Sequence, residues 1–174
     1  MRSTAPTLIL LVFLTGAVAL SSPDTGWAQS GETEKSETGK YYDAEGDPTY
    51  HVADDGTVDW YTYSGFRRYH SECHVCHGPD GLGSSFAPPL VHSMERMSYT
   101  DFAEVVVNGR ENVNTANQSK MPAFGLNPNV MCYLEDIFIY LKARSEGAVG
   151  RGRPAKKEAK NDAAKAEEDS CMGS

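Results

Sequence analysis

Cys73-His74-Val75-Cys76-His77 is the stretch of sequence that decides the fold of this chain. C-x-x-C-H is the attachment sequence of a c-type haem: two cysteines bind the porphyrin vinyl groups as thioethers, and the next histidine binds the iron. A bare C-x-x-C also occurs in redox dithiols and in zinc sites. The first needs a βαβ pattern that this sequence lacks, and the second needs two further ligands at short spacing. The motif therefore predicts one covalent haem on Cys73, Cys76 and His77.

The N-terminus predicts export. An apolar run at residues 8–20 follows Arg2, and it is shorter than the roughly 20 residues that a membrane-spanning helix needs. Residues 1–28 fit a secretory signal peptide that ends at the small-x-small site Gly26-Trp27-Ala28. Cleavage after Ala19 and an uncleaved anchor are the alternatives. We expect a periplasmic protein without stable insertion into a membrane.

Charge and length set the remaining limits. The net charge is −8, and the acidic extension at residues 29–57 carries eight acidic and two basic residues. This balance argues against a nucleic-acid-binding surface and makes the extension a candidate for steering a basic partner. The 146 residues that follow the signal peptide suffice for one domain.

Helical patterns predict an all-α domain at residues 58–145. We expect a first helix capped by Asp59 that leads into the haem motif, a second at residues 100–107 and a third that opens at Asn127-Pro128. Residues 29–40 lack an apolar period and predict disorder, whereas residues 41–58 predict an extended strap or short hairpin. Residues 146–174 read as a flexible polar tail.

The sixth iron ligand separates an electron carrier from a haem protein that binds small molecules. Met121 is the favoured candidate because it lies in a stretch without helical pattern, 44 residues after His77, and beside Pro122. On the other side of the haem, the Pro88 carbonyl is expected to accept the imidazole Nδ1–H of His77. The weaker candidates for the sixth position are His51, His70, His92, Met94, Met97 and Met131.

Several other side chains have two readings each. Arg67 or Arg68 either meets a haem propionate or belongs to a solvated face of the first helix. Cys132 lies on the face of its helix away from the apolar residues, and an exposed cysteine in an oxidising compartment seldom stays free. A Cys132–Cys171 disulfide is the expected pairing, with an intermolecular bridge or two free thiols as alternatives.

The motifs together resemble a known family. The order helix–CHVCH–APPL–helix–KMPAFG–helix resembles the class I cytochromes c. The segments WYTYSGFRRYHSECHVCHGPDGLG, VVVNGREN, KMPAFGLNPNVMCYLEDIFIYL and RGRPAK are similar to those of the four-cysteine, methanol-metabolism-related c-type cytochromes. The resemblance implies thioethers at Cys73 and Cys76, axial ligation by His77 and Met121, and a pyrroloquinoline-quinone (PQQ) dehydrogenase as partner.

The sequence therefore predicts a single-domain class I cytochrome c fold around one haem c, and an electron carrier rather than an enzyme. His/Met ligation fills both axial positions and favours Fe(II). Electrons are expected to arrive from a quinoprotein (PQQ) alcohol dehydrogenase and to leave to a downstream cytochrome or an oxidase. A ligand-binding or peroxidatic haem protein and a haem-containing assembly factor are the alternatives.

Overall fold

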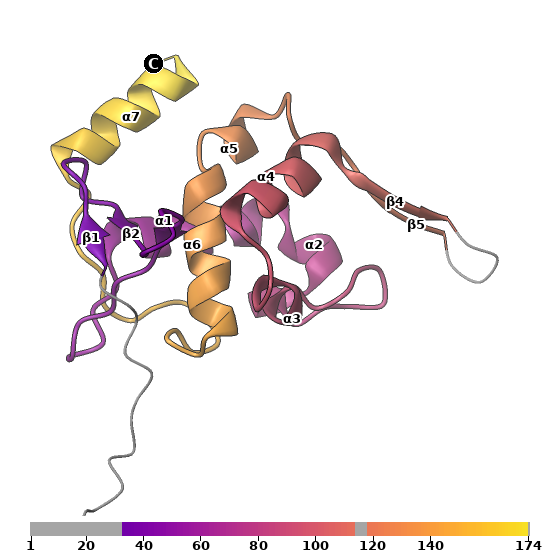
Figure 1. The fold of residues 1–174 in the computed structure, drawn as a ribbon, viewed down its shortest axis with the longest axis horizontal. Coiled ribbons are helices and arrows are strands. Elements are labelled where there is room, and N and C mark those ends of the chain that lie inside the picture. Colours follow the sequence, from indigo (N-terminus) through magenta and orange to yellow (C-terminus); the bar gives the residue numbers. More distant parts are fainter. Residues whose placement is uncertain (1–32, 114–117, 174) are drawn as a thin grey trace, which may run out of the picture.

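The computed structural model describes residues 33–113 and 118–173, and the signal peptide expected at residues 1–28 lies outside them (Figure 1). The described chain is mostly helical, which confirms the expected fold class. Its helices are α1 (Trp60–Glu72), α2 (His74–His77), the 3-10 turn η1 (Pro79–Gly81), α3 (Leu90–Met94), α4 (Tyr99–Asn108), α5 (Pro128–Met131), α6 (Leu134–Ser145) and α7 (Asp162–Met172). None of these described helices is long and apolar enough to cross a membrane.

The packing of α1 against α6 forms the framework of the domain. Gly65 makes the close approach possible, because a Cβ atom there would lie 1.8 Å from the backbone oxygen of Asp136. Asp59 caps α1 as expected and accepts a hydrogen bond of 2.9 Å from the Thr62 N–H. The main core between the helices contains Tyr69, Phe102, Val106, Val130, Leu134, Ile137, Phe138, Tyr140 and Leu141.

The N-terminal strap is a small antiparallel sheet beside this framework. It consists of β1 (Glu34–Lys35), β2 (Tyr41–Tyr42) and β3 (Pro48–Thr49), in that order. The prediction of disorder is wrong for residues 33–40, because strand pairing and an ion pair hold them to the domain. Lys40 Nζ lies 2.7 Å from Glu135 Oε2 on α6. Residues 29–32 lie outside the described chain.

The third predicted helix is divided in two. Asn127 caps α5 as the Asn-Pro signal indicates, but Tyr133, with φ −133° and ψ 20°, separates α5 from α6. The break turns Cys132 toward α7 while Tyr133 and Leu134 stay buried. Helical periodicity did not reveal it, because the buried positions keep nearly the same spacing on both sides.

The prediction of a flexible C-terminal tail is wrong for residues 146–173. Val149 and Ala164 are buried, and the backbone of Val58 pairs with the segment around Lys157. The sulfur atoms of Cys132 and Cys171 lie 1.97 Å apart in a disulfide. The polar composition hid this packing, because the segment is held by a few small apolar contacts, hydrogen bonds, cation–π contacts and one covalent link, and not by a long apolar pattern.

The stretch around Met121, which has no helical pattern in the sequence, contains a β-hairpin. Strand β4 (Arg110–Val113) pairs antiparallel with β5 (Gln118–Met121), and the hairpin extends away from α4 (Figure 1). Met121 is therefore the last residue of a strand and is paired directly with Arg110. Short polar strands of this kind lack the alternating apolar pattern that predicts a strand.

Candidate haem site

The attachment motif begins where α1 ends. Cys73 is the C-cap of α1 and donates its backbone N–H to the Tyr69 carbonyl, at 2.9 Å. The next four residues form α2, which brings Cys73, Cys76 and His77 onto one short turn. Burial raises the pKa of the Cys73 thiol to about 12. A reactive dithiol requires the opposite shift, toward the thiolate, so the site does not have the character of a redox C-x-x-C.

His77 is buried and oriented for metal ligation. Its Nδ1 lies 3.2 Å from the carbonyl oxygen of Pro88, where the sequence analysis placed this contact. With the proton on Nδ1 donated to that carbonyl, Nε2 is left as the free electron-pair donor. The Gly83 N–H donates to the His77 carbonyl at 2.7 Å and folds the following loop back toward the imidazole.

The loop after His77 is fixed by Tyr69 from α1. The hydroxyl of Tyr69 donates to the Gly78 carbonyl at 2.5 Å and accepts from the Gly81 N–H at 3.0 Å. Gly78 has φ 73°, and a Cβ atom there would lie 2.1 Å from the backbone oxygen of Gly83. Only glycine fits this turn, which directs the chain away from the imidazole.

Asp80 connects this loop to the C-terminal segment. It is buried and has the left-handed φ of 59°. The groups around it are the Gly152 N–H at 2.9 Å, the Tyr140 hydroxyl at 3.4 Å, Arg151 Nε at 3.5 Å, His70 Nε2 at 3.6 Å and Arg144 Nε, which donates to its carbonyl at 3.3 Å. Burial alone would raise the pKa of Asp80, but the Gly152 N–H and the Arg144 charge hold it below its usual value. No local sequence pattern indicates this cluster, because its members lie far apart along the chain.

Met121, the expected sixth ligand, ends strand β5. Its side chain is partly buried and packs against the main core, as does Cys73. The residues after it are tied to α4, because the Phe124 and Gly125 N–H groups donate to the Val106 and Val107 carbonyls at 2.9 and 3.1 Å. This places the thioether at a fixed point beside α4.

The weaker ligand candidates have other contacts. Met94 is a buried core residue, and Met131 packs on the same core. His51 stacks on Tyr41 with ring centroids 4.6 Å apart, and His92 lies beside Glu95. His70 Nδ1 contacts the Phe66 carbonyl at 2.8 Å. Met97 lines a pocket between the end of α3, helix α4 and strand β4.

The two arginines of α1 also differ from each other. The Arg68 guanidinium lies 3.4 Å from the centre of the Tyr133 ring, a cation–π contact that holds it away from solvent. Arg67 is exposed. Arg67 therefore lies on a solvated face, as one of the two interpretations expects, whereas Arg68 packs on Tyr133.

The donor set and its surroundings fit a haem. Two thiols, an imidazole with free Nε2 and a thioether are the side chains that the group requires. Three large apolar side chains are strongly exposed: Val75 at 71%, Phe86 at 78% and Leu126 at 100%. The first lies inside the attachment motif and the others follow Cys76 and Met121. Within residues 33–113 and 118–173, no three His, Cys, Asp or Glu side chains are placed to hold a metal ion without a porphyrin.

These features define a c-type cytochrome, and comparisons with known proteins show that the chain belongs to that family. It is 57% identical over 136 residues to cytochrome c-553I of Paracoccus denitrificans, a match that covers 78% of this chain and 60% of that protein. It is 38% identical over 96 residues to cytochrome c-555 of Methylococcus capsulatus (Bath), which covers 55% of this chain and 72% of that protein.

A solved structure supports the same assignment. The crystal structure of the c-type cytochrome XoxG from Methylobacterium extorquens AM1 superposes with a TM-score of 0.74 and 51% identity, covering 82% of this chain and 87% of that one. No protein-family model matches the chain. The chain spans about 60% of the length of cytochrome c-553I. As a c-type cytochrome it carries covalently bound haem c, and the family consists of electron-transfer proteins rather than enzymes.

Proposed function

We propose that this chain is a periplasmic monohaem carrier of single electrons, with thioethers at Cys73 and Cys76 and axial ligation by His77 and Met121. The observation that carries the proposal is the contact of His77 Nδ1 with the Pro88 carbonyl, which leaves Nε2 for the iron. The haem supplies one-electron Fe(III)/Fe(II) chemistry. A buried imidazole and a fixed thioether leave no axial position for a substrate, which supports electron transfer over catalysis.

The proposed compartment rests on two independent features. Residues 1–28 have the pattern of a secretory signal peptide. The Cys132–Cys171 disulfide adds to this, because disulfides persist in oxidising compartments such as the bacterial periplasm.

The proposed docking surface surrounds the attachment motif. Val75, Phe86 and Leu126 are exposed apolar side chains. Ser84 Oγ donates to the Cys76 carbonyl, which holds the loop carrying Phe86 beside the motif. Contacts between redox proteins are small, so a few exposed apolar side chains suffice for a transient complex.

The proposed electron donor is a quinoprotein (PQQ) alcohol dehydrogenase, and the acceptor is a downstream cytochrome or an oxidase. The resemblance to the methanol-metabolism-related cytochromes supports this donor and this acceptor. A cytochrome that accepts electrons one at a time matches a donor whose reduced quinone must lose two.

The ligand set is tested by near-infrared absorption. The oxidised protein is expected to show the weak sulfur-to-iron charge-transfer band of methionine ligation, and Met121→Ala is expected to abolish it. Met172→Ala, an exposed site on α7, is the matched control and keeps the band. A band that survives in Met121→Ala means that another methionine binds the iron. Rapid carbon monoxide binding by the reduced wild-type protein would favour a ligand-binding haem protein instead.

The donor and the docking surface are tested by stopped-flow reduction with a purified PQQ-dependent alcohol dehydrogenase. Phe86→Ala and Leu126→Ala are expected to lower the second-order rate constant several-fold, because each removes apolar area at the contact. Met172→Ala serves again as the control and leaves the rate constant unchanged. No reduction of the wild-type protein by the dehydrogenase rejects the proposed donor, and equal rates in all variants reject the proposed surface.

A further inference from the structure

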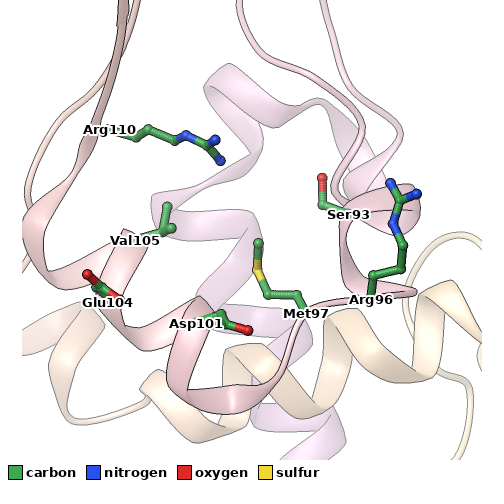
Figure 2. A pocket seen from close by; sticks show the side chains of 7 residues that line it. All are labelled: Ser93, Arg96, Met97, Asp101, Glu104, Val105 and Arg110. Atoms are coloured by element: carbon green, nitrogen blue, oxygen red, sulfur yellow. The ribbon is translucent and has the colours of Figure 1, made fainter.

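A pocket of about 510 Å³ lies between the segment after α3, helix α4 and strand β4 (Figure 2). Its lining residues are Ser93, Arg96, Met97, Asp101, Glu104, Val105 and Arg110. Figure 2 shows the Arg110 guanidinium reaching toward the middle of the pocket and the Arg96 side chain running along the opposite wall beside Ser93, with Met97 between the two arginines. The pocket thus combines an apolar centre with two cationic walls.

The walls of the pocket come from the two sides of the haem site. Arg96 and Met97 follow directly on the segment that begins at Pro88, whose carbonyl contacts His77. Arg110 is the cross-strand partner of Met121 in the β4–β5 hairpin. Directly paired residues in an antiparallel ladder place their side chains on the same face. A flat group between His77 and Met121 therefore has these two arginines at the ends of its two flanking segments.

The two arginines supply the N–H donors that an anion in the pocket would need. Within the described residues, neither arginine forms an ion pair. Two acids from α4 also line the pocket, but Asp101 accepts a hydrogen bond of 2.8 Å from the Ser98 hydroxyl at the start of the helix. Glu104 is exposed. Arginine presents a planar fork of N–H donors that matches a carboxylate in a bidentate contact.

We propose that Arg96 and Arg110 bind the two carboxylate groups of the haem and thereby fix its orientation and raise its reduction potential. The inference rests on the proposed axial ligands. Haem carries its propionates on the edge away from its vinyl groups, so attachment at Cys73 and Cys76 directs the carboxylates away from α2. The arginines are positioning residues: they hold the cofactor and their charge favours the Fe(II) state.

The size of the expected effect follows from Coulomb's law. A unit charge about 10 Å from the iron contributes roughly 0.4 to 1.7 kcal/mol for effective dielectric constants between 80 and 20. Arg96→Gln or Arg110→Gln should therefore lower the equilibrium constant for one-electron reduction by about two- to seventeenfold. Arg110→Lys keeps the charge but loses the fork, so it should restore most of the potential.

The experiment uses redox titration and resonance Raman spectroscopy of the holoprotein. Arg67→Gln is the matched control, because it removes the same charge from an exposed site on α1. We expect a lower potential and a shifted propionate bending mode in Arg96→Gln and Arg110→Gln, with haem content and the near-infrared band unchanged. Potential shifts no larger than that of Arg67→Gln, or an unshifted bending mode in both variants, overturn the inference. Absence of the near-infrared band from the wild-type protein would instead reject the proposed axial ligands. That result is distinguishable from a failure of the arginine proposal, which leaves the band in place.

Discussion

The two sides of the haem site are held in different ways. On the His77 side, the Tyr69 hydroxyl donates to the Gly78 carbonyl, the Pro88 carbonyl accepts from His77 and the Asp80 carboxylate accepts from the Gly152 N–H, and these hydrogen bonds fix the loop that carries the imidazole. On the Met121 side, the proposed ligand lies at the end of a hairpin whose outward ion pair joins two exposed side chains, Glu111 and Lys120. Exposed ion pairs contribute little to stability.

The Met121 side is stabilised from its C-terminal end instead. The chain after Met121 pairs with α4 and continues through α5 to Cys132, which is bonded to Cys171. The comparison indicates that polar contacts hold the imidazole locally, whereas backbone pairing and a covalent link position the thioether. The two sides should therefore respond differently to reduction, to acid and to substitution.

Removal of the disulfide should have the largest effect on stability. The bond links residues separated by 39 positions. A loop of this length corresponds to about 3–4 kcal/mol in the chain-entropy model. The double variant Cys132→Ser/Cys171→Ser should lose a large part of this free energy of unfolding in denaturant titration. Intact mass of the wild-type protein should show haem added and two hydrogens missing.

Two further measurements determine which part of the chain the disulfide stabilises and whether the bond lies within one chain. Limited proteolysis should cut the double variant near α7 first, while the haem absorbance is kept. A non-reduced intact mass equal to two linked chains would assign the bond to a dimer and contradict the intramolecular pairing.

Asp80→Asn should weaken the His77 side by about 2–3 kcal/mol at pH 7, the magnitude of a hydrogen bond to a charged group. Asparagine tolerates the left-handed φ of this position, so the variant isolates the charge. The pKa of Asp80 is lowered in the fold, so its stabilising contribution is present above its unfolded pKa and is lost as the pH falls through the folded value.

The pH dependence of the Asp80 contribution to stability can be tested directly. The difference in unfolding free energy between wild-type protein and Asp80→Asn should shrink as the pH falls through the lowered pKa of folded Asp80. Asp54→Asn, at an exposed carboxylate, is the control and should show almost no difference at neutral or acidic pH. A difference for Asp80→Asn that stays constant with pH would show that the charge of Asp80 does not hold the loop.

Asp136, in the framework shared by both sides, should show the opposite pH dependence. Burial raises its pKa to about 7, against a hydrogen bond from Ser64. Its stabilising contribution is therefore present at low pH and is lost as the pH rises toward 7. Asp136→Asn should leave stability nearly unchanged at pH 4 and increase it by about 1–3 kcal/mol at pH 8. Equal pH profiles for both proteins in denaturant titration would contradict the shift.

The sequence predicted the parts of the site that depend on local chemistry. The C-x-x-C-H motif, the Asp59 cap and the Pro88 carbonyl each depend on a few neighbouring residues. Asp80 was missed because its partners come from three distant segments, at residues 70, 140–144 and 151–152. Periodicity cannot bring such segments together.

The C-terminal segment was misread for a related reason. Its lysines and arginines suggested a solvated tail, but Arg153 and Lys157 lie over the Tyr63 ring at 5.4 and 5.1 Å. A basic side chain that packs on an aromatic ring looks the same in sequence as one in water. The disulfide predicted for Cys171 was the one sign that the segment returns to the domain.

The acidic strap should have the smallest effect, on the rate of docking. Figure 1 shows β1 and β2 on the side of α6 away from α2 and the β4–β5 hairpin. Two of its acids are already paired, because Lys142 Nζ lies 2.5 Å from Asp43 and Lys156 Nζ lies 3.0 Å from Asp55. Their fields are therefore weakened before they reach a partner at the haem motif, and salt screens them further.

The last prediction compares paired with unpaired acids at equal change of charge. Glu45→Gln/Asp54→Asn removes two exposed carboxylates without an ion pair among the described residues, and Asp43→Asn/Asp55→Asn removes the two paired ones. At low salt we expect the first pair to slow reduction by the dehydrogenase less than twofold. The second pair should change the rate no more, because it frees two lysines while it removes two acids. A several-fold slowing and a flatter salt dependence in the first pair would show that the strap steers docking across the width of the domain. Unchanged rates in both pairs would assign docking to the apolar surface around the haem motif.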